Sequence, residues 1–262
     1  IQTPDGEEIA EIFTVKTYLP DSLSSMNNQQ ACILNKRASL SSLVYDDKRA
    51  QYVVASRLSF FQGDDDALRL YIPLIVSCCL LQEGFIFDSA RTLSNTPSEE
   101  ADLAGKSEPS EWAEKEFNFA QKTMESFGLS SFFDERGLTV EFPWQPNAIS
   151  VAMNDETSLL TMSSDKTHPY LGNGLFSKLE LPEHFEREKL IAIVNKLNNI
   201  ELCAVDSPPF FGAWCSDLSS NRISFVCFLP NFVYSKGTAN NIAVWMVARN
   251  RQVRIAIANM EF

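Results

Sequence analysis

The sequence predicts an α+β fold made of two related units, each an antiparallel β-sheet with helices packed on one face. Segments with apolar residues at helical spacing alternate with short runs of strand-forming residues, and turn residues separate them. The order strand, Leu-Pro, helix, short strand and longer strand also occurs twice, around Leu19-Pro20 and around Leu181-Pro182. The chain has 262 residues, of which 45% are hydrophobic, so it can form a folded core.

The first half is predicted to open with a strand at 11–18, which ends at Leu19-Pro20. A helix follows from Asp21 or Ser22, either of which can cap it, to about Arg37. Its apolar residues recur at helical spacing, which supports the assignment.

A β-hairpin is expected next, with strands at 39–45 and 51–61 joined by the turn Asp46-Asp47-Lys48. The run Asp64-Asp65-Asp66 suits the start of a helix, because carboxylates stabilise the positive end of the helix dipole. Gly84 is predicted to end that helix.

Residues 91–111 are rich in Ser, Glu, Pro and Ala, and we interpret them as a linker. A helix is expected at 112–127, with Gly128 at its end. The remaining expected helices are 183–198 and 239–249, and the expected strands are 138–142, 149–153, 158–162, 175–181, 201–205, 211–217 and 223–228.

An internal duplication would explain the repeated order of segments. Asn35-Lys36 follows the first Leu-Pro helix, and Asn195-Lys196 follows the second. The predicted division is therefore a partial first repeat at 1–90, the linker at 91–111 and a complete second repeat at 112–262. In this interpretation the first repeat lacks the opening helix and strands, or they lie upstream of the chain.

This order of helix, antiparallel meander, helix, further strands and closing helix resembles the type III secretion chaperone-like fold, which includes the YbjN-like family. The resemblance covers residues 112–249 and part of 11–82, and it rests on element order and on the Asn-Lys, strand, strand, helix pattern. It implies a small acidic protein of the bacterial cytoplasm that binds extended peptide segments of secreted proteins or, like other members of that fold, has no known activity.

The charge of the chain disfavours two classes of partner. The net charge is -12 and the sequence pI is about 4.7. Nucleic-acid binding depends on Lys and Arg that neutralise phosphates, and anionic membrane surfaces attract basic segments. We therefore expect neither a nucleic-acid partner nor insertion into a membrane. The longest apolar run, 70–81, is also shorter than the roughly 20 residues that a spanning helix needs.

The cysteines indicate a reducing compartment. Cys78-Cys79, Cys32 and Cys227 lie within apolar runs, which is typical of small buried side chains. No CxxC motif or zinc-spaced Cys/His cluster occurs, and no nucleotide or calcium fingerprint is present, so we predict no cofactor and no metal. A cytoplasmic location with reduced thiols is expected.

The first candidate site is the segment from His168 to Gly174, His-Pro-Tyr-Leu-Gly-Asn-Gly. Its glycines could let backbone amides approach an anion, with His168 as an acid, base or ligand and Asn173 beside it. The alternative is a simple Pro/Gly/Asn turn that leads into a strand.

The second candidate site is the aromatic run after Pro208-Pro209. Phe210, Phe211 and Trp214 could form a ledge for a peptide, because aromatic side chains anchor interfaces. Trp245 and Arg249 share a face of the last helix and could line a groove beside it. The alternative is a core strand whose aromatic side chains pack on that helix.

Three functions remain open on these grounds. The first is a non-enzymatic protein-binding module, chaperone-like or adaptor-like, with a protein or peptide partner. The second is an enzyme of unknown reaction centred on the loop from His168 to Asn173; a nucleophilic Cys215 would further require a nearby base and a lowered pKa. The third is a ligand-free scaffold whose tandem units pack as an intramolecular pseudo-dimer. As a partner, a second copy of the chain in a homodimer is the alternative to that intramolecular arrangement.

Overall fold

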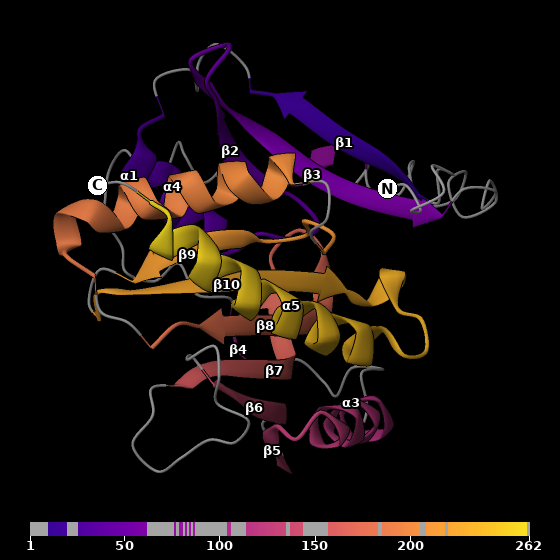
Figure 1. The fold of residues 1–262 in the computed structure, drawn as a ribbon. Coiled ribbons are helices and arrows are strands. Elements are labelled where there is room, and N and C mark those ends of the chain that lie inside the picture. The colour runs from indigo at the N-terminus through magenta and orange to yellow at the C-terminus, as the bar shows by residue number, and fades with distance from the viewer. Residues whose placement is uncertain are drawn as a thin grey trace.

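The structure is a computed structural model of the chain. It describes residues 10–19, 26–61, 104–105, 114–134, 137–143, 157–182, 185–204, 208–217 and 220–260, together with 76, 79, 80, 82, 84 and 86. These residues form two antiparallel sheets with helices packed against them, so the predicted α+β class is confirmed (Figure 1).

The smaller sheet has three strands in the order β1-β3-β2. The helix that follows β1 starts later than predicted, because Asn27 and Gln30 form a capping box at its first turn. Residues 21–25, where the predicted start falls, lie outside the described residues. The elements are β1 (Ala10–Tyr18), α1 (Asn28–Asn35), β2 (Ser42–Asp46) and β3 (Gln51–Phe61).

The larger sheet has seven strands in the order β5-β6-β7-β8-β10-β9, with β4 paired to β7 beside this path. Its strands are β4 (Ala104–Gly105), β5 (Ser130–Asp134), β6 (Gly137–Pro143), β7 (Thr157–His168), β8 (Gly172–Glu180), β9 (Ala213–Asp217) and β10 (Arg222–Pro230). The other elements are α3 (Glu114–Ser126), α4 (Arg187–Cys203), the 3-10 turn η2 (Asn231–Val233) and α5 (Thr238–Ala258).

The helix α4 lies between the small sheet and the β9 edge of the large sheet (Figure 1). One apolar core joins Val53 and Ala55 of β3 to Val194 of α4, Trp214 of β9 and Met246 of α5. The two halves of the sequence thus share one core. At the end of the large sheet opposite β9, the strands β5 and β6 pack against α3.

Two segments of the chain have the same topology. The first unit is β1-α1-β2-β3 and pairs its strands in the order β1-β3-β2, whereas the second unit is β8-α4-β9-β10 and pairs them in the order β8-β10-β9. All of these pairings are antiparallel. Each unit therefore places its last strand between the other two.

The hairpins of the two units agree in detail. Leu43 pairs with Val54 in the first unit, and Trp214 pairs with Phe225 in the second, so the partners are eleven positions apart in both. Asp46 to Gln51 and Asp217 to Arg222 are also the same length of chain. The residue just before the second strand has a positive φ in each hairpin: 53° at Ala50 and 54° at Asn221.

Several predicted elements need correction. The strand expected at 201–205 is wrong, because Glu201–Cys203 form the last turn of α4. Gly84 does not end its helix, since Gly84 and Ile86 are both helical. The small sheet is covered on both faces rather than one: Val53 packs in the large core and Val54 packs in a second cluster with Leu34 and Ile86.

Other predictions fall partly or wholly outside the described residues. These are the strand at 149–153, the acidic helix start at 64–66 and most of the linker at 91–111. Within that linker range, Ala104–Gly105 form β4 and pair with Lys166 and Thr167 of β7. The division into 1–90, 91–111 and 112–262 stays a prediction.

Candidate functional site

The two units exchange short segments where they meet. Phe210, just before β9, forms a bridge with Arg57 of β3, with hydrogen bonds in both directions (2.8 and 3.4 Å). Reciprocally, the amide of Phe228 in β10 donates to the carbonyl of Ala38, and the Ser39 hydroxyl donates to the carbonyl of Phe228 (3.1 and 2.7 Å). Phe210 thus pairs with β3 beyond the end of β2, and Ala38 is hydrogen-bonded to β10 beyond the end of β9. Each of these segments extends the sheet of the other unit.

A buried asparagine seals the outer edge of the shortest strand in each unit. The Asn35 side chain donates to the carbonyl of Leu43 and accepts from its amide (2.9 and 2.8 Å). The Asn198 side chain makes the same two bonds with Trp214 (3.0 and 2.7 Å). These bonds satisfy backbone groups of β2 and β9 that would otherwise be open to another strand.

By these contacts, Asn35 is equivalent to Asn198 rather than to Asn195. An alignment that matches the two Asn-Lys pairs is therefore displaced by about one helical turn. Asn195 instead accepts a hydrogen bond from the Tyr52 hydroxyl of the first unit (3.3 Å). In the opposite direction, Cys32 of α1 accepts from the amide of Ser216 in β9 (3.2 Å). The helices α1 and α4 also each contact both β2 and β9, the edge strands of the two units.

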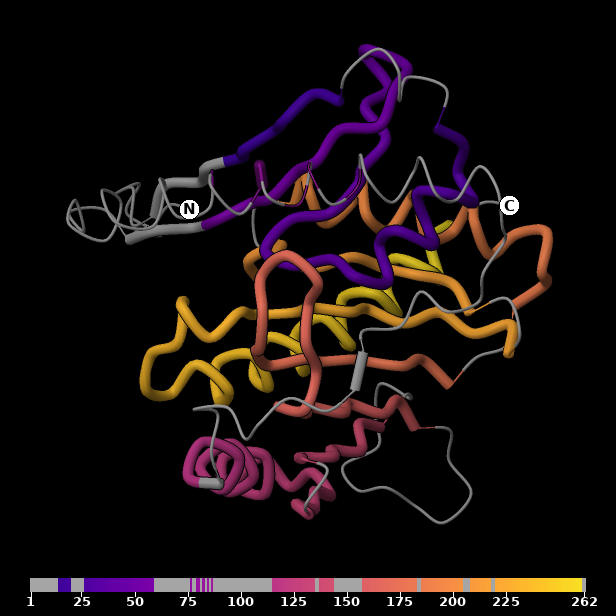
Figure 2. The backbone as a smooth tube through the Cα atoms, turned by 180° about the vertical axis from the view of Figure 1, so that it is seen from behind, coloured from indigo at the N-terminus to yellow at the C-terminus, as the bar shows by residue number. Residues whose placement is uncertain are grey.

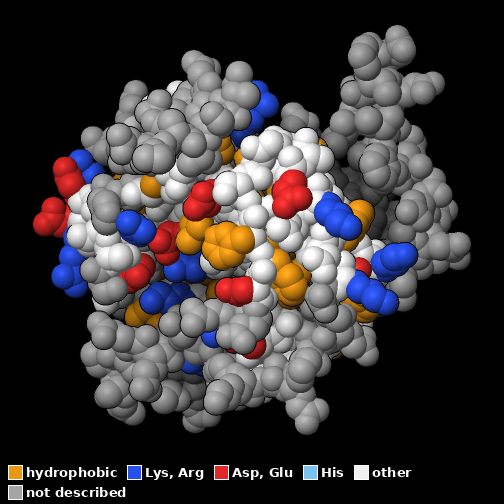
Figure 3. All heavy atoms as spheres, turned by 90° about the horizontal axis from the view of Figure 1, so that it is seen from below, with side chains coloured by type: hydrophobic (Ala, Val, Ile, Leu, Met, Phe, Trp, Pro, Cys, Tyr) orange, Lys and Arg blue, Asp and Glu red, His pale blue; other side chains and the backbone are white. Residues whose placement is uncertain are grey.

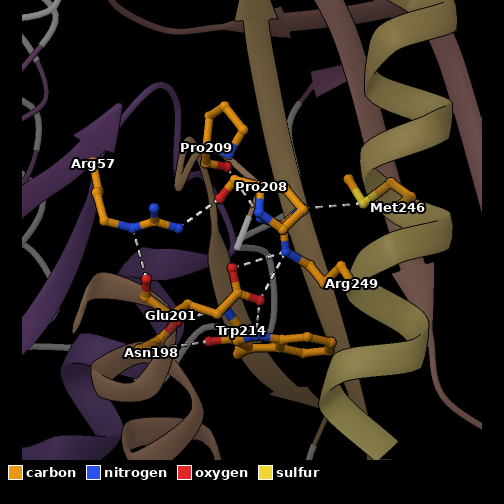
Figure 4. A network of polar contacts seen from close by, with 8 residues as sticks. All are labelled: Arg57, Asn198, Glu201, Pro208, Pro209, Trp214, Met246 and Arg249. Atoms are coloured by element: carbon orange, nitrogen blue, oxygen red, sulfur yellow. Dashed lines mark hydrogen bonds and ion pairs between the residues drawn. The ribbon is translucent and has the colours of Figure 1, made fainter. Parts of the chain in front are cut away.

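A buried charge network lies beside one of the exchanged segments (Figure 4). Glu201, at the end of α4, accepts two hydrogen bonds from Nε of Arg249 (2.7 and 2.9 Å) and one from Nε1 of Trp214 (2.8 Å). The side chains of Arg249 and Glu201 are only 3% and 8% exposed. Arg249 also lies 3.8 Å over the ring of Phe225, so its guanidinium group lies between this ring and the Glu201 carboxylate.

The second arginine of the network comes from the first unit. Arg57 donates through Nε to the carbonyl of Glu201 and through Nη2 to the carbonyl of Pro208 (2.9 and 2.7 Å). Arg249 similarly donates to the carbonyl of Pro209 (3.1 Å). Burial lowers the pKa of Arg57, and the nearby Glu201 carboxylate opposes that shift. The network holds the proline loop and the two units together.

The space next to this network is too small for a substrate. A cavity of about 10 Å³ beside Arg249 is lined by Phe211, Trp245, Met246 and neighbouring apolar side chains. This volume suits at most one water molecule. In this structure the network therefore functions as a structural tie.

The structure brings together five of the residues predicted for binding, but it buries three of them. Phe210, Trp214 and Arg249 lie in the interior, and only Phe211 and Trp245 are partly exposed. The rings of Phe211 and Trp245 meet edge to face at 6.0 Å. This packing of the aromatic run on α5 is the alternative that the sequence left open.

The other two predicted residues lie apart from this group, at the β7–β8 hairpin. Nδ1 of His168 accepts from the amides of Tyr170 and Leu171 (3.2 Å each), and Asn173 accepts from the Thr167 hydroxyl (2.9 Å). Burial lowers the pKa of His168 to about 4, so the imidazole is neutral near pH 7. This hairpin tip lies beside the chain that leads from α1 to β2 (Figure 2), which is where Arg37 contacts His168.

The buried thiols of Cys215 and Cys227 do not have the character of nucleophiles. Burial raises the pKa of Cys215 well above its usual value and raises that of Cys227 to about 12. A catalytic cysteine needs the opposite shift. Among the described residues, no group of three or more His, Cys, Asp or Glu side chains is arranged to hold a metal ion.

Comparison of the chain with protein-family models, with curated proteins and with solved structures found no match. Within the described part of the chain, no helix combines the length and the apolar character that crossing a membrane requires.

Two sheet edges differ from the sealed edges of β2 and β9. The outer edges of β1 and β5 pair with no other described strand. Each carries an exposed aromatic side chain: Tyr18 on β1 is 42% exposed and Phe132 on β5 is 50% exposed. On the face that carries α3 and β5, hydrophobic side chains lie among charged ones (Figure 3).

Sequence reasoning missed the edge-sealing asparagines and the strand β5. An asparagine within an apolar helix, as at Asn198, is a usable indication of a buried polar partner, because a buried amide must be hydrogen-bonded. The strand β5 is only five residues long and follows Gly128 closely, so its sequence offers little periodicity.

Proposed function

We propose that this protein is a protein-binding module, chaperone-like or adaptor-like, that holds an extended segment of a partner along an open sheet edge. The observation that carries the proposal is the contrast between edges. Asn35 and Asn198 each seal both backbone groups of a residue on β2 and β9, whereas no described strand pairs with the outer edge of β1 or β5. On β5 the carbonyl of Ser131 accepts a bond from the Gln121 side chain (3.4 Å). A free edge presents backbone donors and acceptors that an extended peptide can satisfy.

The aromatic side chains at these edges support the same function. Tyr18 and Phe132 are large and exposed, and aromatic groups contribute strongly to protein interfaces. The expectation from the resemblance, binding of extended peptide segments, agrees with this mode. The bacterial, cytoplasmic setting is part of the proposal and is open to the same test.

We further infer that the two units are diverged copies that form an intramolecular pseudo-dimer. Support comes from the common strand order, the equal hairpins, the positive φ at Ala50 and Asn221, and the edge-sealing Asn35 and Asn198. The exchanged segments around Ala38 and Phe210 are what a domain-swapped dimer of single units would show.

The proposal can be tested by affinity capture from extract of the source organism with wild-type protein and with the double variant Val15→Lys, Phe132→Lys. Lysine on an edge strand opposes pairing with a further strand. Phe119→Lys is the matched control, because Phe119 is 52% exposed and belongs to α3 rather than to an edge strand. We expect a stoichiometric partner that the control retains and the double variant loses. A set of captured proteins that is identical for all three would contradict the proposal.

The alternative functions have weaker support. An enzyme at the loop from His168 to Asn173 stays a prediction, and no specific observation favours it, because His168 is buried and caps its own turn. A ligand-free scaffold would require that the open edges take no partner at all. A partner that the double variant loses would therefore exclude the scaffold, and capture of no specific partner would favour it.

A further inference from the structure

The strand pairings of the two units show which strand of the second unit corresponds to β1. Thr17 of β1 pairs with Val54, and Leu179 of β8 pairs with Phe225, while Val54 and Phe225 occupy equivalent hairpin positions. The strand β8 is therefore the equivalent of β1. This agrees with the sequence, because Leu19-Pro20 then aligns with Leu181-Pro182 and Lys16 with Lys178.

The equivalent edge is occupied in the second unit. The strand β7 pairs antiparallel along the outer edge of β8, with Leu160 opposite Leu179, Thr161 opposite Lys178 and Met162 opposite Ser177. In the first unit, no described strand takes this place beside β1. The same slot is thus filled in one unit and open in the other.

The side chains of β1 are more exposed than the side chains at the corresponding positions of β8. Ser177 and Leu179 are buried, but Val15 and Thr17 at the corresponding positions of β1 are only half-buried. On β7, the side chains that cover this face are Leu160 and Met162, both buried. The core-facing side of β1 therefore lacks the apolar cover that a neighbouring strand supplies to β8.

We propose that the outer edge of β1 accepts an extended segment of a partner protein as an added antiparallel strand, placed as β7 is placed on β8. This inference rests on the proposed function and specifies its site. The segment would carry apolar side chains at alternate positions, opposite Thr17 and Val15. The polar side chains between them would lie opposite Tyr18, Lys16 and Thr14.

The charges beside β1 indicate the character of those polar side chains. Near the Tyr18 end of this strand, three cations, Lys16, Lys48 and Arg49, outnumber the two carboxylates Asp46 and Asp47, in a chain whose overall charge is strongly negative; Glu11 lies towards the other end of β1. Lys16 pairs with Asp46 at 3.1 Å, and Arg49 lies 4.0 Å over the ring of Tyr18. Acidic side chains on the solvent face of the partner strand complement this local excess of cations.

The probe for the test is a synthetic peptide with the sequence of residues 157–164, which fills the slot in the second unit, carrying two glutamates at each end. Amide hydrogen exchange of the full chain is measured with and without it. We expect exchange at 10–18 to slow about tenfold when free peptide is about ten times its Kd. A peptide with serine in place of Leu160 and Met162 should give no protection.

Variants of the protein and of the peptide separate the site from the fold. Val15→Lys should abolish the protection of β1, and Phe132→Lys should retain it. Because Val15→Lys could also disturb folding, the peptide is additionally N-methylated at its odd or at its even positions. Only one of the two isomers should lose binding, since alternate amides of a strand point to the same neighbour.

Other outcomes would overturn the inference in distinguishable ways. Protection at 130–134 that Phe132→Lys removes would place the partner on β5, which rejects the β1 site but retains the proposed function. A dimer in sedimentation that Val15→Lys dissociates would make a second copy the occupant of the edge. Absence of protection at both edges would reject this inference together with strand addition as the proposed mode.

Discussion

The two units have the same backbone plan but different interiors. At equivalent positions the first unit has Leu43 and Val54, whereas the second has Trp214 and Phe225. The strand order, the hairpin length and the asparagine seal remain the same. Backbone hydrogen bonding therefore defines the unit, while the size of its core side chains varies with what each face packs against.

The clearest difference lies at the two exchanged segments. Beside Phe210 the first unit contributes Arg57, and a charge network with Glu201 and Arg249 encloses the segment. At the equivalent position beside Ala38 the second unit has Phe228, whose ring lies 5.5 Å from that of His168. One junction is thus held by buried charge, and the other by apolar packing with a neutral histidine.

The largest effect is expected at the charged junction. Glu201→Gln removes the carboxylate that neutralises Arg249, so the free energy of unfolding should fall by about 3–5 kcal/mol. Urea denaturation measures this. The control is Glu180→Gln: Glu180 also pairs with two cations, Lys178 and Arg222, but it is partly exposed, and its loss should cost about 1 kcal/mol or less. Equal losses would show that the network is not a buried tie.

The histidine junction should make stability depend on pH. The pKa of His168 is about 4 in the folded protein and about 6.5 when unfolded, so the unfolded state binds more protons between these values. The contribution is complete above pH 6.5 and is lost as pH falls to 4, by up to about 3 kcal/mol. Urea denaturation across pH 4–7.5 measures the slope, and His168→Gln should reduce it, leaving the part that carboxylates such as Asp46 and Glu180 contribute at the acid end. An unchanged slope in that variant would contradict the assignment.

The asparagine seals allow a direct comparison of the units. Asn35→Ala and Asn198→Ala each leave an amide and a carbonyl of an edge strand without their partner, so each should cost about 2 kcal/mol. Matched urea titrations of both variants are the measurement. Losses that agree within about 1 kcal/mol support equivalence of the seals. An unchanged free energy of unfolding in either variant would contradict the equivalence of the two seals.

The smallest effect is expected at the hairpin turns. Ala50 has a left-handed φ that strains a residue with a Cβ atom, so Ala50→Gly should stabilise the protein by about 0.5–1 kcal/mol. Asn221→Gly should change stability little, because asparagine tolerates this conformation well. The midpoints of urea denaturation distinguish the two. A gain at Asn221 that exceeds the gain at Ala50 would reverse the ordering of strain between the units.

The elements that were predicted well have strong local signals. The strand at 51–61, the hairpin turn before it and the helix that ends at Gly128 all follow from short-range patterns. The strand at 201–205 was wrong because Glu201-Leu202-Cys203 can extend α4, and the partners that favour this, Arg249 and Trp214, are distant in sequence.

The candidate site was predicted only in composition. The aromatic residues around Phe210 and Trp214 do gather with Arg249, but whether they are exposed depends on Arg57, which is more than 150 residues earlier in the chain. The open edge of β1 could not be recognised without β7 and β8, since a strand sequence does not state whether a neighbour is present.

The amino-acid sequence by itself determined the α+β class, most strands and helices, the acidic character and the repeated order around the two Leu-Pro pairs. These properties are local, because periodicity, capping and turn preferences act over a few residues. Only the tertiary structure decided which edges are sealed, which segments are exchanged and which charges are buried. These depend on contacts between Asn35 and Leu43, Arg57 and Glu201, or Ala38 and Phe228, and burial by remote segments is not encoded in any one stretch of chain.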